Sequence, residues 1–145
     1  MKSEPVWMEP TNQQLKEVLI QAETVAILGI SANPSRASNE IARYLLENSK
    51  YEVFFVNPAI SELFGKPVYP NLASIPTKID IVDVFRKSTD LPSVFDEAIA
   101  IVPKTIWLQL GLSNPELARQ AQGQGINVVM DRCIKIEHEK FNVAD

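Results

Sequence analysis

Five short apolar segments, separated by helical patterns, constrain the fold of this chain most strongly. Each is a nearly continuous run of apolar residues, as in VAIL and VFFV, and none shows a regular alternation with polar residues. Strands of a parallel sheet have this composition when helices cover both of its faces. The runs lie at residues 24–30, 51–58, 79–86, 104–111 and 125–132. They predict an α/β, Rossmann-like, doubly wound five-stranded parallel sheet in three α/β/α layers, with strand order 3-2-1-4-5.

The segments before and between these runs carry helical patterns. Apolar residues recur at helical spacing in residues 11–23, 38–49, 88–101 and 113–125. Thr11 and Ser38 are the predicted N-caps of the first two helices. Residues 59–76 break the alternation because proline and turn residues are frequent there. We predict an extended loop in this segment, with a short helical turn near residues 72–74.

Length and composition favour a single folded domain. The chain has 145 residues, of which 46% are hydrophobic. We interpret residues 1–145 as one domain, with an N-terminal helical extension over 1–23 and a tail over 137–145.

No apolar run approaches the roughly 18 residues of a membrane span, and the N-terminus lacks the apolar core of a secretory signal. A single cysteine suits the reducing cytoplasm, and a net charge of −4 argues against nonspecific nucleic-acid binding. We therefore expect a cytoplasmic protein with neither nucleic acid nor membrane as a partner.

Polar residues follow each of the five predicted strands. In open α/β sheets, ligands bind beyond the carboxyl ends of the strands, near the point where the strand order reverses. Three of these polar residues are arginines, whose planar guanidinium suits phosphate oxygens. The set, in strand order, is Ser31 and Arg36, Asn57 and Pro58, Arg86, Gln109, then Asp131, Arg132 and Cys133. It predicts a ligand with several phosphates. The alternative is that Arg86 and Arg132 form ordinary ion pairs with Asp83 and Asp131.

The loop after the first strand, GISANPSRAS, argues against a nicotinamide dinucleotide. Gly29 permits a tight turn and leaves room for a ligand to approach. The free N–H groups of the following helix favour an anion, and Arg36 adds charge at the same place. A dinucleotide fingerprint would need two further glycines and an acidic residue after the second strand. Neither is present, since the second strand ends in Asn57-Pro58.

The motifs VAILGISANPSRAS, VFFVNP, FGKPVYPNLASIP, IDIVDVFR, TIWLQLG and VVMDRC, in this order, resemble the stand-alone bacterial CoA-binding proteins. These are similar to the CoA-binding domain of the succinyl-CoA synthetase alpha subunit and of NDP-forming acyl-CoA synthetases. The resemblance covers residues 24 to about 136 and implies coenzyme A, or an acyl-CoA, as the ligand. Combined with the strand-end residues, it predicts a binding site made of Gly29, Ser31, Pro34, Arg36, Ser38, Asn57, Pro58, Lys66, Val68, Phe85, Arg86, Gln109, Arg132 and Cys133.

One departure from the synthetases bears on activity. Succinyl-CoA synthetase uses a phosphorylated histidine from a further domain, and the only histidine here, His138, lies in a charged segment that we interpret as a solvated tail. One histidine and one cysteine form neither a catalytic triad nor a metal cluster. We therefore expect a non-catalytic binding module. The alternatives are a nucleotide-dependent enzyme and a ligase subunit that acts with a separate catalytic partner.

Two further questions stay open at this point. The chain has either a second copy of itself, in a homodimer, or a separate ligase subunit as its protein partner. If the pantetheine arm of CoA reaches Cys133, oxidation would join the two thiols in a mixed disulfide.

Overall fold

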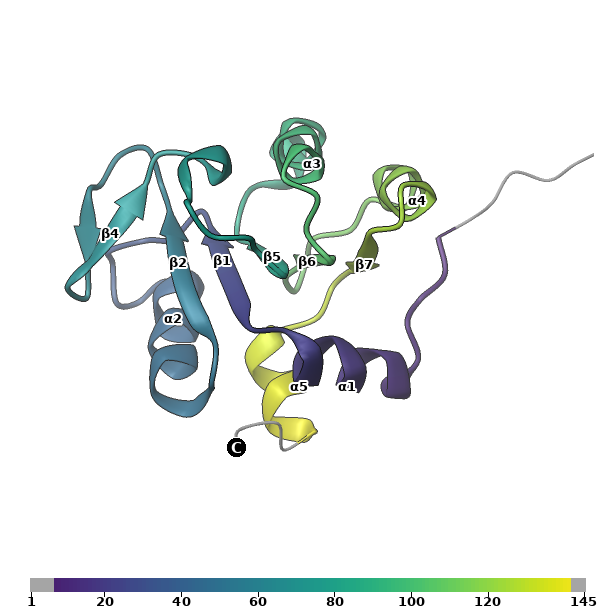
Figure 1. Cartoon of the computed structure of the whole chain (residues 1–145), viewed down its shortest axis with the longest axis horizontal. Helices are drawn as coiled ribbons and strands as arrows, with labels where there is room; N and C mark the ends of the chain where they lie inside the picture. The colour runs from purple at the N-terminus through teal and green to yellow at the C-terminus, as the bar shows by residue number, and fades with distance from the viewer. Residues whose placement is uncertain (1–6, 142–145) are drawn as a thin grey trace, which may run out of the picture.

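The computed structural model describes residues 7–141 and shows helices on both sides of a central sheet (Figure 1). The strands are β1 (Thr24–Leu28), β2 (Glu52–Val56), β3 (Glu62–Leu63), β4 (Lys66–Tyr69), β5 (Ile81–Val84), β6 (Thr105–Leu108) and β7 (Asn127–Val129). The α-helices are α1 (Asn12–Gln21), α2 (Ala37–Asn48), α3 (Leu91–Ala100), α4 (Pro115–Gly123) and α5 (Ile134–Lys140). Short 3-10 turns at Leu72–Ser74 and Ser88–Asp90 complete the described elements.

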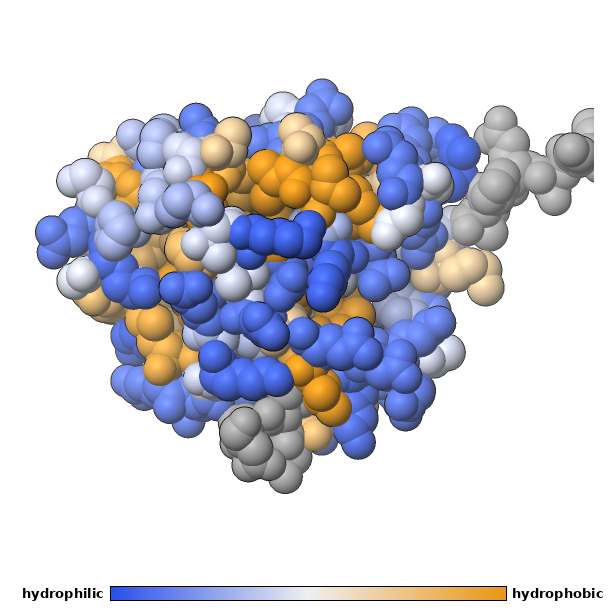
Figure 2. Space-filling view, in the orientation of Figure 1, coloured by the Kyte–Doolittle hydropathy of each residue, from blue (hydrophilic) through white to orange (hydrophobic). Residues whose placement is uncertain are grey.

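Each face of the sheet has its own apolar layer. The helices α3 and α4 pack on one face, and α1, α2 and α5 pack on the other (Figure 1). Every residue of β1, β5 and β6 is buried, which explains why these strands are continuous apolar runs in the sequence. The outer surface differs, since hydrophilic side chains cover most of the visible face in Figure 2 and hydrophobic ones gather near α3. The predicted fold class, α/β and Rossmann-like with helices on both faces, is confirmed.

The predicted strand order and strand number are wrong. The sheet has seven strands in the order β3-β4-β2-β1-β5-β6-β7. The third predicted strand, β5, pairs with β1 rather than with β2. The position beside β2 belongs to β4, which comes from the segment 59–76 that was predicted as a loop. Sequence patterns missed β3 and β4 because both are short and lie at the sheet edge, where Pro67 is tolerated. The helical turn at Leu72–Ser74 is confirmed.

The two ends of the described chain pack against the sheet. Thr11 caps α1 as predicted, in a reciprocal hydrogen-bond pair with Gln14. Residues 137–140, expected in a solvated tail, belong to α5 instead. His138 on this helix is only 1% exposed, and its Nδ1 lies 2.7 Å from the hydroxyl of Tyr44. The prediction of a solvated histidine is therefore wrong, because α5 turns His138 and Glu137 inward while Glu139 and Lys140 are exposed.

Asp83 is an unusual residue for the centre of the sheet. It lies on β5 between Ile27 of β1 and Trp107 of β6, and its side chain is fully buried. Neither of its carboxyl oxygens has a hydrogen-bond partner within residues 7–141. Burial without a partner disfavours the charged form, so the pKa of Asp83 is raised well above its ordinary value. The predicted alternative of an Asp83–Arg86 ion pair is thereby excluded.

The raised pKa of Asp83 makes stability depend on pH. The unfolded chain releases this proton in the ordinary aspartate range, whereas the folded chain does so at higher pH, so stability falls as pH rises above that range. Asp83→Asn removes the ionisation from both states. We expect its free energy of unfolding in urea to exceed that of the wild type by about 1 kcal/mol or more at neutral pH. The excess should shrink as the pH is lowered toward the aspartate range. A difference that is the same at acidic and neutral pH would contradict the assignment.

Candidate functional site

The candidate site lies where the chain leaves β1 and β5 in opposite directions. Both strands are parallel neighbours, so their carboxyl ends lie at the same edge of the sheet. After β1 the chain passes to α2 on one face, and after β5 it passes to α3 on the other. This divergence is the reversal point at which α/β sheets bind ligands.

Gly29 brings the two diverging loops into direct contact. It has a φ of +95°, and a Cβ atom at this position would lie 2.3 Å from the carbonyl oxygen of Phe85 and 3.0 Å from the Cδ of Arg86. The space left by the missing side chain is thus filled by the loop after β5. The sequence-based reason for this glycine, room for a ligand, needs correction: the glycine is required by packing within the protein. Its consequence is that the loop of Arg36 and the loop of Arg86 lie side by side at one edge of the sheet.

The first loop is held in shape by its own polar side chains. Ser31 donates its backbone N–H to the Oγ of Ser38 at 3.0 Å, and Asn39 donates its side-chain N–H to the carbonyl of Ser31 at 2.9 Å. Ser38 is buried and does not cap α2, contrary to prediction, because the N-cap lies two residues earlier, at Arg36. Arg43, which sequence reasoning missed, donates to Asn39 at 2.9 Å and to the carbonyl of Pro34 at 3.0 Å. Its spacing of four residues from Asn39 on one helix was the available signal.

The positive end of α2 is only partly neutralised, because the acid in its first turn, Glu40, is paired with Lys135 at 3.3 Å. No side chain caps it, and Arg36 is exposed with no side-chain partner among the described residues. Acceptor side chains are preferred at an N-cap, because the free N–H groups there carry partial positive charge. A guanidinium at this position adds positive charge to a positive end. The arrangement is electrostatically incomplete without an anion, and an anion would find both backbone donors and a charged fork there.

Two more cations follow β5 at the same edge of the sheet. Arg86 is 38% exposed at its side chain and forms a loose ion pair with Asp90 at 3.4 Å. Lys87 is exposed and has no side-chain partner within the described chain. Phe85, which follows β5 and precedes Arg86 in the chain, has a half-buried aromatic ring. Arg36, Arg86 and Lys87 therefore form a cationic half of the strand-end edge.

Two residues predicted as ligand contacts form hydrogen bonds within the protein. Asn57 donates to the carbonyl of Ile30 at 2.7 Å and accepts from the backbone of Ala59 at 2.8 Å, which fixes the loops after β1 and β2. Gln109 is buried and accepts the backbone N–H of Ile134 at 3.1 Å, which fixes the start of α5. Pro58, beside Asn57, is exposed on the same edge.

Lys66 and Val68 are not at the strand-end edge. Val68 is buried on β4 beside Phe55, and Lys66 lies two residues earlier on a strand parallel to β2. Because the strands are parallel, Tyr69 rather than Lys66 reaches the carboxyl edge, next to Val56. The sequence missed this because β4 itself was not predicted.

The end of β7 differs in charge from the end of β1. Arg132 pairs with Glu9 at 2.7 Å and with Glu137 at 3.4 Å, so its charge is already neutralised. Asp131 accepts the backbone N–H of Gly111 at 2.8 Å rather than pairing with Arg132. Cys133, half-buried, is the N-cap of α5. These residues line a cavity of about 430 Å³. The mixed disulfide of Cys133 with CoA stays a prediction.

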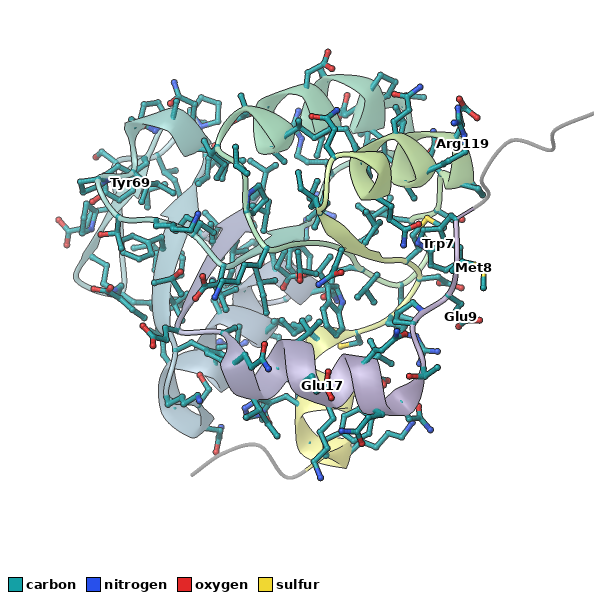
Figure 3. All side chains as sticks on the ribbon, turned by 45° about the vertical axis from the view of Figure 1, so that its right-hand side comes forward. Trp7, Met8, Glu9, Glu17, Tyr69 and Arg119 are labelled. Atoms are coloured by element: carbon teal, nitrogen blue, oxygen red, sulfur yellow. The ribbon has the colours of Figure 1, made fainter. Side chains whose placement is uncertain are left out.

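The two lateral ends of the sheet lie on opposite sides of the molecule. Figure 3 places Tyr69, at the end of β4, on the opposite side of the molecule from Trp7 and Glu9, which lie near α4 and β7.

Among residues 7–141, no helix is long and apolar enough to cross a membrane. The described part of the chain also has no cluster of three metal-ligating side chains.

Known proteins share both the sequence and the fold. A family model described as CoA binding domain matches residues 23–139. The uncharacterized protein YneT of Bacillus subtilis is 36% identical over 129 residues, which cover 89% of this chain and 95% of that protein. A solved structure from Thermus thermophilus has a TM-score of 0.85 at 38% identity and covers 91% of this chain and 99% of that one. The ADP-forming acetate–CoA ligase I of Archaeoglobus fulgidus is 26% identical over 81% of this chain but only 18% of the ligase.

The family match begins just before β1 and ends within α5, so it contains the whole sheet and the loops at its carboxyl edge. The helix α1 lies outside the matched region. Both relationships seen in the sequence motifs are present, one to short chains of similar length and one to a segment of a much longer ligase. The chain belongs to the CoA binding domain family.

Proposed function

We propose that this protein binds coenzyme A or an acyl-CoA at the carboxyl edge of the sheet, with the phosphates at the N-terminus of α2. The observation that carries the proposal is the uncapped start of α2 with Arg36 at its N-cap, where the acid of the first turn, Glu40, is already paired with Lys135. Membership of the CoA binding domain family supports the same ligand. Arg86 and Lys87 across the cleft are placed to meet a second phosphate group.

The chemistry of the cleft favours CoA over a nicotinamide dinucleotide. CoA carries a phosphate on its ribose, so its ribose calls for cations, whereas NAD calls for an acidic residue after the second strand. Asn57 and Pro58 stand at that place, and Asn57 already uses its amide within the protein. The exposed cations lie on the neighbouring loops instead.

The 3′-phosphate supplies the most direct test of the proposed function. CoA should bind more tightly than dephospho-CoA, because removing that phosphate removes charge-assisted hydrogen bonds, and both affinities should weaken as salt rises. Isothermal titration calorimetry at two salt concentrations measures both effects. Equal affinities for the two ligands would contradict a cationic site that contacts the 3′-phosphate, and no detectable binding of either would overturn the proposal.

Arg36 can be tested separately from the fold. Arg36→Ala should weaken CoA binding by about 1.5–3 kcal/mol, the scale of hydrogen bonds to charged groups. Thermal stability should stay nearly unchanged, because the exposed side chain has no partner within the described chain. Arg119→Ala is the matched control, since Arg119 pairs with Glu116 on the outside of α4 (Figure 3). A lower melting temperature with unaltered CoA affinity would make Arg36 structural.

We propose further that the chain acts as a binding module rather than as an enzyme, and that it works in the cytoplasm. Burial of His138 supports this, since the histidine lies against Tyr44 and Tyr51 rather than at the strand-end cleft. The alternative is a ligase subunit with a separate catalytic partner, favoured by the likeness to a segment of the Archaeoglobus fulgidus ligase. An assay of the isolated chain with ATP, acetate and CoA measures whether the chain alone has ligase activity. Neither a binding module nor an isolated ligase subunit should form product. Product formation that persists through repurification would overturn the binding-module proposal.

A further inference from the structure

A second hollow at the strand-end edge has a character unlike that of the phosphate cleft. It is a cavity of about 430 Å³ beyond the ends of β6 and β7. Leu110 follows β6, Ile136 lies on α5, and Trp7 comes from the segment before α1. Leu110 is 61% exposed and Ile136 is 54% exposed, so two large aliphatic side chains face the same hollow with little protein against them. Exposed apolar groups gathered in a concave site indicate a binding surface more often than scattered ones do.

The charge of this cavity excludes a phosphate. Its ionisable lining consists of Glu9, Asp131, Arg132 and Glu137, which is three acids and one base. The base, Arg132, is already held by two of those acids. A phosphate here would meet net negative charge and no free cation. A neutral, apolar group would instead cover Leu110 and Ile136 without displacing an ion pair.

The cavity lies within reach of the phosphate cleft. Both are at the carboxyl edge of one parallel sheet, and β1 and β7 are separated by three strand spacings through β5 and β6. At about 4.8 Å per spacing, this distance is about 14 Å. The pantetheine arm of CoA has roughly a dozen successive bonds of about 1.3–1.5 Å each, which is long enough to bridge it.

We propose that this cavity receives the acyl chain of an acyl-CoA whose phosphates occupy the cleft at α2. The proposal rests on the proposed function and deepens it, because it makes an aliphatic acyl-CoA, rather than free CoA, the preferred ligand. The cationic half of the edge binds the charged end of the ligand, and the apolar cavity at β6 and β7 binds its neutral end. One wall of the cavity, formed by Trp7 and Glu9, lies outside the matched family region, whereas Leu110 and Ile136 lie within it.

The test is an acyl-length series. The dissociation constants of CoA, acetyl-CoA, butyryl-CoA and hexanoyl-CoA are measured by calorimetry under one salt condition. Because each buried methylene contributes about 0.8 kcal/mol at most, affinity should rise about two- to fourfold per added methylene. Flat affinity along the series, with CoA itself bound, would overturn this inference and leave the proposed function standing. Absence of binding by every member would overturn both.

A pair of matched variants locates the effect. Ile136→Ser should reduce the ratio of hexanoyl-CoA to CoA affinity at least severalfold, because it removes an aliphatic wall of the cavity. Ile20→Ser is the control, since Ile20 is also an exposed helical isoleucine, 44% exposed, but lies on α1 outside this cavity. The control should keep the wild-type ratio. If both variants keep it, or if both lose it equally, the acyl chain binds elsewhere. Melting temperatures of the two variants identify any loss that comes from unfolding.

Discussion

The packing of Gly29 against the carbonyl oxygen of Phe85 is the contact on which the strand-end site depends. Backbone hydrogen bonds hold the main chain on both sides of this contact. The N–H of Gly29 donates to the carbonyl of Val56 at 3.0 Å, and the N–H of Phe85 donates to the carbonyl of Leu28 at 2.8 Å. Three neighbouring strands thus meet at one residue that has neither a side chain nor an ordinary φ. Only glycine satisfies both conditions at low cost. The two loops diverge to opposite faces immediately afterwards, and both Arg36 and Arg86 lie at this edge of the sheet.

Most polar side chains at this edge hold the loops in place. Ser38, Asn39, Arg43 and Asn57 all hydrogen-bond to loop backbone or to one another. A loop that is already ordered loses less conformational entropy when a ligand binds. Arg36 and the first N–H groups of α2 have no side-chain partner among the described residues. They are therefore the groups that can donate hydrogen bonds to a ligand.

The strand-end edge divides into two halves of different character. The half at β1 and β5 carries Arg36 and Lys87 without side-chain partners among residues 7–141, whereas the half at β6 and β7 has its one arginine paired and exposes aliphatic side chains. A ligand that is charged at one end and neutral at the other matches this division better than one that is charged throughout. The segment before α1 contributes to it, because Glu9 pairs with Arg132 and the Trp7 indole donates to Val128 on the edge strand at 3.0 Å.

The sequence by itself determined the fold class, because strands buried on both faces must be apolar throughout. It also determined which residues follow the five main strands, and their motifs identified the family. It did not determine the strand order, since β4 is too short to show a strand pattern and only pairing with β2 makes it one. The local sequence likewise does not show which polar strand-end side chains hydrogen-bond within the protein. Asn57 and Gln109, predicted as ligand contacts, also hydrogen-bond within the protein, to the loop after β1 and to the start of α5. The burial of His138 and the pairing of Arg132 with Glu9 were decided by tertiary packing for the same reason: each depends on residues nearly a hundred or more positions away.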